Sequence, residues 1–205
     1  MKNKTTIRIL LTGLLLTVMI LGMTGCQTTN PFVGAWAMYS IAKGDSIVED
    51  GYHLIGFWNF NQIGNLTSFS IDDSRFIEYN DDWYLSLDEV FERKDSLSKE
   101  FEGSKKYISN TCKYTVDEEN NVLSLITKAS DTQYGEDWPI DQVYPTTDTT
   151  ESTSEYKYGI SKGSNSSEDT ITLQFIRLYN DETMVEHTIE DDVVLVRIDD
   201  LPAFN

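Results

Sequence analysis

Apolar residues after about position 30 recur mainly at every second residue, a spacing that indicates β-strands rather than helices. In residues 170–179, for example, Ile171, Leu173 and Phe175 share one face. Further strands fit residues 33–40, 52–60, 66–71, 75–79, 106–116, 122–128, 155–161, 183–189 and 192–198. About eight to ten short strands joined by polar turns predict an all-β antiparallel meander, either a closed barrel or a β-sandwich.

Two stretches interrupt this alternation. Residues 84–102 place Leu87, Val90 and Leu97 near helical spacing between charged residues, which predicts one short helix or lid. Residues 129–154 are rich in Thr, Ser and Asp, and they have too few apolar side chains to bury. We therefore expect a long, flexible polar loop over that range.

The first 25 residues have the layout of a secretory signal. Lys2, Lys4 and Arg8 precede an apolar run from Ile9 to Leu21. That run of about 13 residues is shorter than the roughly 20 residues that span a bilayer as a helix. The pattern predicts a signal peptide over residues 1–25, with a transmembrane anchor as the alternative.

The segment Met23-Thr24-Gly25-Cys26 resembles the lipobox of bacterial lipoprotein precursors. This resemblance implies cleavage before Cys26, lipid attachment at Cys26 and membrane association through that lipid anchor. Residues 26–31 would then be a lipidated tether, and residues 32–205 a β domain outside the cytoplasm, in the periplasm or at the cell surface.

Charge and cysteine content limit the classes of partner and scaffold. The chain has 16 Lys and Arg residues against 34 Asp and Glu residues, a net charge of −18. Such a surface repels phosphate backbones, so we expect no nucleic-acid partner. The chain has two cysteines, which excludes a disulfide-rich scaffold. Once Cys26 is lipidated, Cys112 is left to serve as a small core residue.

The predicted first strand begins with Gly34-Ala35-Trp36, and a Gly-x-Trp at this place resembles the lipocalins, especially lipocalin-like domains of bacterial lipoproteins. The resemblance implies that Gly34 permits tight packing at the barrel floor and that Trp36 closes the floor. It also implies that an arginine of the last strand stacks on Trp36. Arg197 is the matching candidate, and Arg177 is its rival.

The sequence lacks a recognisable constellation for chemistry. It contains two histidines, His53 and His187, and no calcium-loop, nucleophile-elbow or P-loop pattern. We therefore predict no catalytic residue, no metal site and no cofactor, and a protein that is not an enzyme.

Aromatic residues are the better functional clue, because they crowd residues 52–84. They either fill a β core or line a pocket for a small apolar ligand. The candidate pocket residues are Phe57, Trp58, Phe60 and Phe69. We expect a lipid-anchored protein that binds a small apolar ligand or an envelope component. The alternative is a structural or adhesion envelope protein that acts through protein–protein contacts.

Overall fold

The computed structural model describes residues 30–42, 51–71, 85–138, 149–165, 168–180, 184–185 and 192–204. The chain divides into two units, Met1–Phe32 and Val33–Asn205. Of the first unit, residues 30–32 are described, and there the Phe32 backbone N–H donates to Asn30 Oδ1. The predicted signal peptide, Cys26 and the predicted strand at 75–79 lie outside the described residues.

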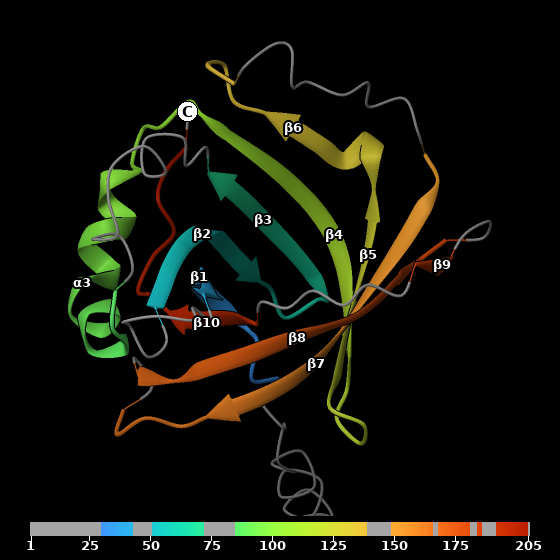
Figure 1. Cartoon of the computed structure of the whole chain (residues 1–205). Helices are drawn as coiled ribbons and strands as arrows, with labels where there is room; N and C mark the ends of the chain where they lie inside the picture. The colour runs from blue at the N-terminus through green and yellow to red at the C-terminus, as the bar shows by residue number, and fades with distance from the viewer. Residues whose placement is uncertain are drawn as a thin grey trace, which may run out of the picture. The chain divides into compact units, whose positions relative to one another are not determined.

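The second unit consists mainly of β-strands and contains one longer helix, α3, among its described residues (Figure 1). Its elements are β1 (Gly34–Ala42), β2 (Gly51–Phe60), β3 (Asn65–Ile71), α3 (Leu87–Glu100), β4 (Tyr107–Asp117), β5 (Val122–Lys128), η2 (Ala129–Asp131), β6 (Thr132–Tyr134), β7 (Glu151–Ser161), β8 (Thr170–Tyr179), β9 (Met184–Val185) and β10 (Val193–Arg197).

Eight of the described strands close into an antiparallel barrel. They are hydrogen-bonded in the order β10-β1-β2-β3-β4-β5-β7-β8, and β8 pairs with β10 to complete the circle (Figure 1). Closure leaves these eight strands with no unpaired edge in the ring. The all-β antiparallel meander predicted from the sequence is confirmed, and the closed barrel replaces the β-sandwich alternative.

Two of the turns show why the chain reverses where it does. Asn61 begins the β2–β3 turn, and its Oδ1 accepts hydrogen bonds from the Ile63 and Asn65 backbone N–H groups. Gly64 completes that turn with φ of +84°. In the β4–β5 turn, Asp117 accepts from both the backbone and the side chain of Asn120. These polar residues satisfy backbone groups that no strand partner reaches.

Helix α3 starts at a capping box. Ser86 Oγ accepts from the Glu89 backbone N–H, and the Glu89 carboxylate accepts from the Ser86 backbone N–H. The predicted short helix is therefore present. Its buried Val90 and Leu97 pack with residues of β1, β2 and β10, so the helix covers the outer wall of the barrel (Figure 1). Among the described residues, no helix has both the length and the apolarity that a membrane span requires.

The predicted polar loop at 129–154 needs correction at both ends. Residues 129–131 form η2, and Thr132–Tyr134 form β6, which pairs with β4. Residues 151–154 belong to β7 and pair with β5. Their polar side chains do not prevent strand formation, because backbone pairing does not require apolar residues on both faces. Residues 139–148 lie outside the described residues.

Candidate ligand site inside the barrel

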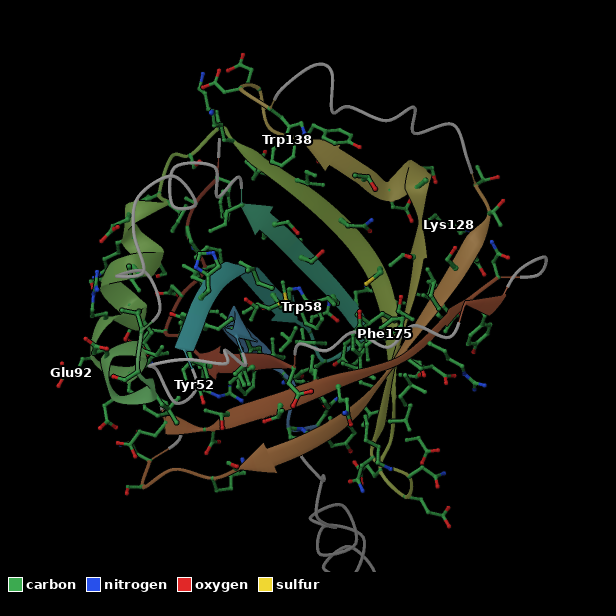
Figure 2. The ribbon with its side chains drawn as sticks, in the orientation of Figure 1. Tyr52, Trp58, Glu92, Lys128, Trp138 and Phe175 are labelled. Carbon is green, nitrogen blue, oxygen red and sulfur yellow. The ribbon has the colours of Figure 1, made fainter. Side chains whose placement is uncertain are left out.

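The two faces of β2 distinguish the inside of the barrel from its outer wall. The Trp58 ring contacts Tyr156 of β7 at a centroid distance of 6.5 Å, although β2 and β7 are not neighbours in the strand order. The contact therefore crosses the interior. Phe57, one residue earlier, contacts Phe101 beyond α3 at 5.7 Å. Trp58 faces inward (Figure 2). Because side chains alternate along a strand, Phe60 faces inward as well, and Phe57 faces outward.

The inner face is sealed in the half of the barrel where β1 begins and β2 ends, which we call the buried half. Trp36, Phe60 and Leu66 are each 1% exposed there. The Phe60 and Tyr114 rings meet edge to face at 4.9 Å. The Tyr114 hydroxyl also donates to the Asn61 carbonyl oxygen at 2.7 Å, which ties the β2–β3 turn to β4.

Arg197 lies over Trp36 at the same end. Its guanidinium carbon is 4.2 Å from the centre of the Trp36 ring, and Nη1 donates to the Val33 carbonyl oxygen at 3.1 Å. Register explains the contact, since Trp36 and Arg197 are direct partners across β1 and β10. The rival Arg177 instead pairs with Glu155 at 2.7 Å and lies over Tyr179.

Gly34 makes room for this stack. Its φ is +131°, in a region that side-chain-bearing residues rarely adopt. A Cβ atom at position 34 would lie 2.4 Å from Arg197 Nη1, so the guanidinium would have to move from its place. The backbone thus requires glycine, and glycine also leaves the guanidinium its place beside Trp36. The three residues singled out by the lipocalin resemblance meet at one place in the structure.

The other half of the interior, toward Ala42 and Gly51, is less buried, and we call it the exposed half. Ser154 faces inward there, because it pairs across β5 and β7 with the buried Leu125. Tyr156 and Phe175 are half-buried, with ring centres 5.5 Å apart. Leu178, the register partner of Ser154, is 38% exposed. Apolar inner side chains therefore reach solvent in this half.

Polar groups also line the exposed half. Ser68 and Asn110 are partners across β3 and β4, in register with the inward Trp58. Ser68 Oγ donates to the Asn110 carbonyl oxygen at 3.3 Å, and Asn110 Nδ2 donates to Thr132 Oγ1 at 3.0 Å. This wall of β3, β4 and β6 is hydrogen-bonding, whereas the wall of β7 and β8 carries aromatic rings.

The four predicted pocket residues do not line one site, and this part of the prediction needs correction. Trp58 and Phe60 face the interior, but Phe57 and Phe69 face the outer wall. Phe69 stacks on Phe204 of the C-terminal segment at 4.5 Å, and Phe57 lies 6.0 Å from the same ring. Both faces of β2 carry apolar side chains, because α3 and the C-terminal segment cover its outer face.

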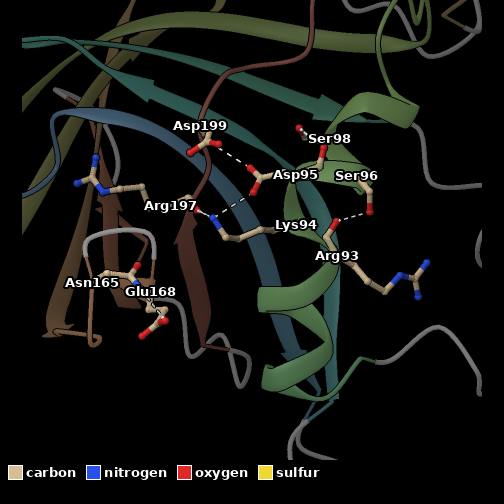
Figure 3. A network of polar contacts seen from close by, with 9 residues as sticks. All are labelled: Arg93, Lys94, Asp95, Ser96, Ser98, Asn165, Glu168, Arg197 and Asp199. Atoms are coloured by element: carbon tan, nitrogen blue, oxygen red, sulfur yellow. Dashed lines mark hydrogen bonds and ion pairs between the residues drawn. The ribbon is translucent and has the colours of Figure 1, made fainter.

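A polar network fixes α3 to the end of β10 (Figure 3). The buried Lys94 donates from Nζ to the Arg197 carbonyl oxygen at 2.6 Å, and Asp95 Oδ1 accepts from the Asp199 backbone N–H at 3.2 Å. Tyr39 of β1 is fully buried in the same outer core, and burial raises the pKa of its hydroxyl. The helix is thus attached to the strand that carries the Trp36-stacking arginine.

One buried thiol lies in the described interior. Cys112 is buried, and burial raises the pKa of its thiol to about 11, so the thiol stays protonated at neutral pH. Within the described ranges, no group of three His, Cys, Asp or Glu side chains could hold a metal ion. What the arrangement offers is an apolar and hydrogen-bonding surface.

Sequence reasoning missed Asn110, Tyr156 and Phe175 as inner residues of the exposed half. The alternation along residues 106–116 places Asn110 on the same face as Cys112 and Tyr114, and that signal could have found it. The alternation in residues 170–179 groups Phe175 with Ile171 and Leu173, but its position next to Tyr156 depends on the pairing of β7 with β8 in the closed barrel, which no local pattern reveals.

Comparison of the chain with protein-family models, with curated proteins and with solved structures found no match.

Proposed function

We propose that this protein is a lipid-anchored lipoprotein of the cell envelope whose lipocalin-like barrel binds a small apolar molecule. The supporting observation is the contrast within the barrel. Trp36 and Arg197 close the buried half, whereas Tyr156 and Phe175 of the exposed half remain partly open to solvent. Partly exposed aromatic side chains on a concave inner wall favour binding of apolar molecules.

The lipid anchor is proposed from the lipobox at Met23–Cys26 alone. Metabolic labelling with palmitate tests it, because the Cys26→Ser variant lacks the thiol that accepts lipid. We expect label in the wild-type protein and none in the variant. Equal labelling of both would contradict the anchor while leaving the ligand proposal in place.

Native mass spectrometry of the gently purified protein tests the ligand proposal. We expect a small neutral mass to remain with the folded chain and to be lost on unfolding. Phe175→Ala, which removes an inner ring, should lower the occupied fraction. Phe91→Ala on α3 serves as the matched control, because Phe91 packs against the outer core. Equal occupancy in the two variants would contradict a site in the exposed half.

The proposed role is non-enzymatic. It is supported by the composition of the described interior, where the buried thiol of Cys112 is held in its protonated form. The other polar groups named inside the barrel belong to serine, threonine, asparagine and tyrosine side chains and to Arg197, and they are suited to binding rather than to proton transfer near neutral pH.

A further inference from the structure

The Asn110 side chain on the inner wall is only partly hydrogen-bonded. Asn110 Nδ2 is engaged by Thr132, but Asn110 Oδ1 is buried and has no hydrogen-bond partner among the described residues. Burying such an atom costs free energy unless something else satisfies it. If the amide is rotated by 180°, the hydroxyl of Thr132 can donate instead, and an amide N–H group is then left over. In both orientations, one polar atom of the Asn110 amide is left to form a hydrogen bond with a ligand.

Three rings share the inner wall of the barrel with this amide. Trp58 pairs with Ser68 across β2 and β3, and Ser68 pairs with Asn110 across β3 and β4. Tyr156 contacts Trp58 across the interior, and Phe175 contacts Tyr156. The Tyr156 hydroxyl is hydrogen-bonded to the Ser154 side chain. A ligand in the exposed half would therefore meet aromatic faces on one side and the Asn110 amide on the other.

The charges on the inner wall, like its amide and its rings, limit which ligands can bind. In the exposed half, Ser68, Asn110 and Ser154, which lie in register with Trp58 and Leu125, are uncharged. On its other side Trp58 pairs with Trp36, and the inward cation next in that row, Arg197, lies over the Trp36 ring in the buried half. The charged pair of Glu155 and Arg177 belongs to the outer wall, because Glu155 pairs with Ser124 rather than with an inward residue. A charged ligand group in the exposed half would be buried without a counter-charge from these positions, because Arg197 is engaged by the Trp36 ring and the Val33 carbonyl oxygen. The net charge of −18 disfavours an anion further.

We infer that the exposed half of the barrel selects a neutral, amphipathic molecule with an aromatic or other apolar body and one hydrogen-bonding group that meets the Asn110 amide. This inference rests on the proposed function, because it names the chemical class of the ligand for the same site. Trp58, Tyr156 and Phe175 hold the apolar body, and Asn110, oriented by Thr132, holds the polar group.

Three fluorescent probes test this selectivity on the full lipidated protein in nanodiscs, with protein-free nanodiscs as background. Diphenylhexatriene is a hydrocarbon without a hydrogen-bonding group. N-phenylnaphthylamine has similar apolar character and one N–H donor. Anilinonaphthalene sulfonate adds an anionic group to that aromatic amine. We expect the neutral amine to bind on the order of tenfold more tightly than the sulfonate, since the site offers no counter-charge.

The Asn110→Leu variant keeps the size of the side chain and removes its amide. It should weaken binding of N-phenylnaphthylamine about fivefold to tenfold, the effect of one lost hydrogen bond, and leave diphenylhexatriene within about twofold. Asn59→Leu is the matched control, because Asn59 is exposed on the outer face of β2 beside Trp58. Thr132→Val, a smaller change that removes the orienting hydroxyl, gives a second reading if Asn110→Leu fails to fold.

The outcomes separate the two proposals. The inference is supported if Asn110→Leu or Thr132→Val binds N-phenylnaphthylamine more weakly than the wild type does and binds diphenylhexatriene equally well. Equal affinity of the folded variants and the wild type for the amine overturns the role of Asn110 but leaves a binding barrel. Equal affinity for the sulfonate and the amine overturns the selection against charge. If none of the probes binds the wild-type protein above background, the proposed function itself fails.

Discussion

The two halves of the barrel interior use aromatic side chains in opposite ways. In the buried half, Trp36 and Phe60 are sealed by neighbours on every side, and Arg197 stacks on the indole. In the exposed half, Tyr156 and Phe175 have the same apolar character but remain partly exposed, and Asn110 adds a polar group to the inner wall. Tight packing in one half stabilises the barrel, whereas the other half keeps partly exposed side chains, and these form the surface that we propose binds a ligand.

The largest expected effect is at the sealed end. Trp36→Ala should lower the free energy of unfolding by about 3–5 kcal/mol, because it removes a buried indole and leaves a cavity beneath Arg197. Urea unfolding followed by circular dichroism measures the change. A loss below about 1 kcal/mol would mean that the buried half does not stabilise the barrel as described.

Replacing one phenylalanine on each side of the barrel wall compares how tightly the outer core and the exposed half are packed. Phe57→Ala, in the outer core under α3, should cost about 3–5 kcal/mol of stability because Phe57 is fully buried. Phe175→Ala should cost roughly half as much, because its ring is partly exposed already. The same urea titrations report both values. Equal losses would show that the exposed half is packed as tightly as the outer core.

A smaller effect is expected where α3 meets β10. Lys94→Met removes the donor to the Arg197 carbonyl oxygen while keeping most of the apolar stem, so stability should fall by about 1–3 kcal/mol. Lys99→Met, at an exposed position of the same helix, should change stability by less than about 0.5 kcal/mol. Thermal unfolding compares the two. Similar shifts would show that the Lys94 contact does not fasten the helix.

The smallest effect concerns chemical reactivity. The raised pKa of Cys112, about 11 in the fold, keeps its thiol protonated at pH 8, so a maleimide should label native protein slowly. Labelling should quicken as the pH rises toward 11, whereas in urea the rate should level off near the ordinary thiol pKa of about 8.5. Mass spectrometry of timed samples follows the reaction. Rapid labelling of native protein at pH 8 would contradict a buried, inward Cys112.

Much of the barrel could be predicted from the sequence, because local signals specify its parts. The period of two in residues 170–179 and the polar turns at Asn61 and Asp117 indicate strands and their reversals without knowledge of the fold. Gly34 and Trp36 also stood out, since their spacing resembles a known motif. Those signals act within a few residues, and the structure follows them.

The candidate site was harder to predict, because it depends on which face of each strand points inward. On β2 both faces are apolar, so the pattern alone could not separate Trp58 from Phe57. The choice is made by α3 and by Phe204, which cover the outer wall from distant parts of the chain. The polar strand at the start of β7 was missed for a related reason: its pairing with β5 is a long-range contact.

Filling the exposed half with a large side chain tests the central claim most directly. Ser154→Trp places an indole between Tyr156 and Leu125 on the inner wall, and Ser124→Trp places one on the outer wall of the adjacent strand. The measurement is a diphenylhexatriene titration of each protein in nanodiscs. We predict saturable binding to the wild type and to Ser124→Trp, and its loss in a folded Ser154→Trp. Unchanged binding in Ser154→Trp would contradict a ligand site inside the barrel.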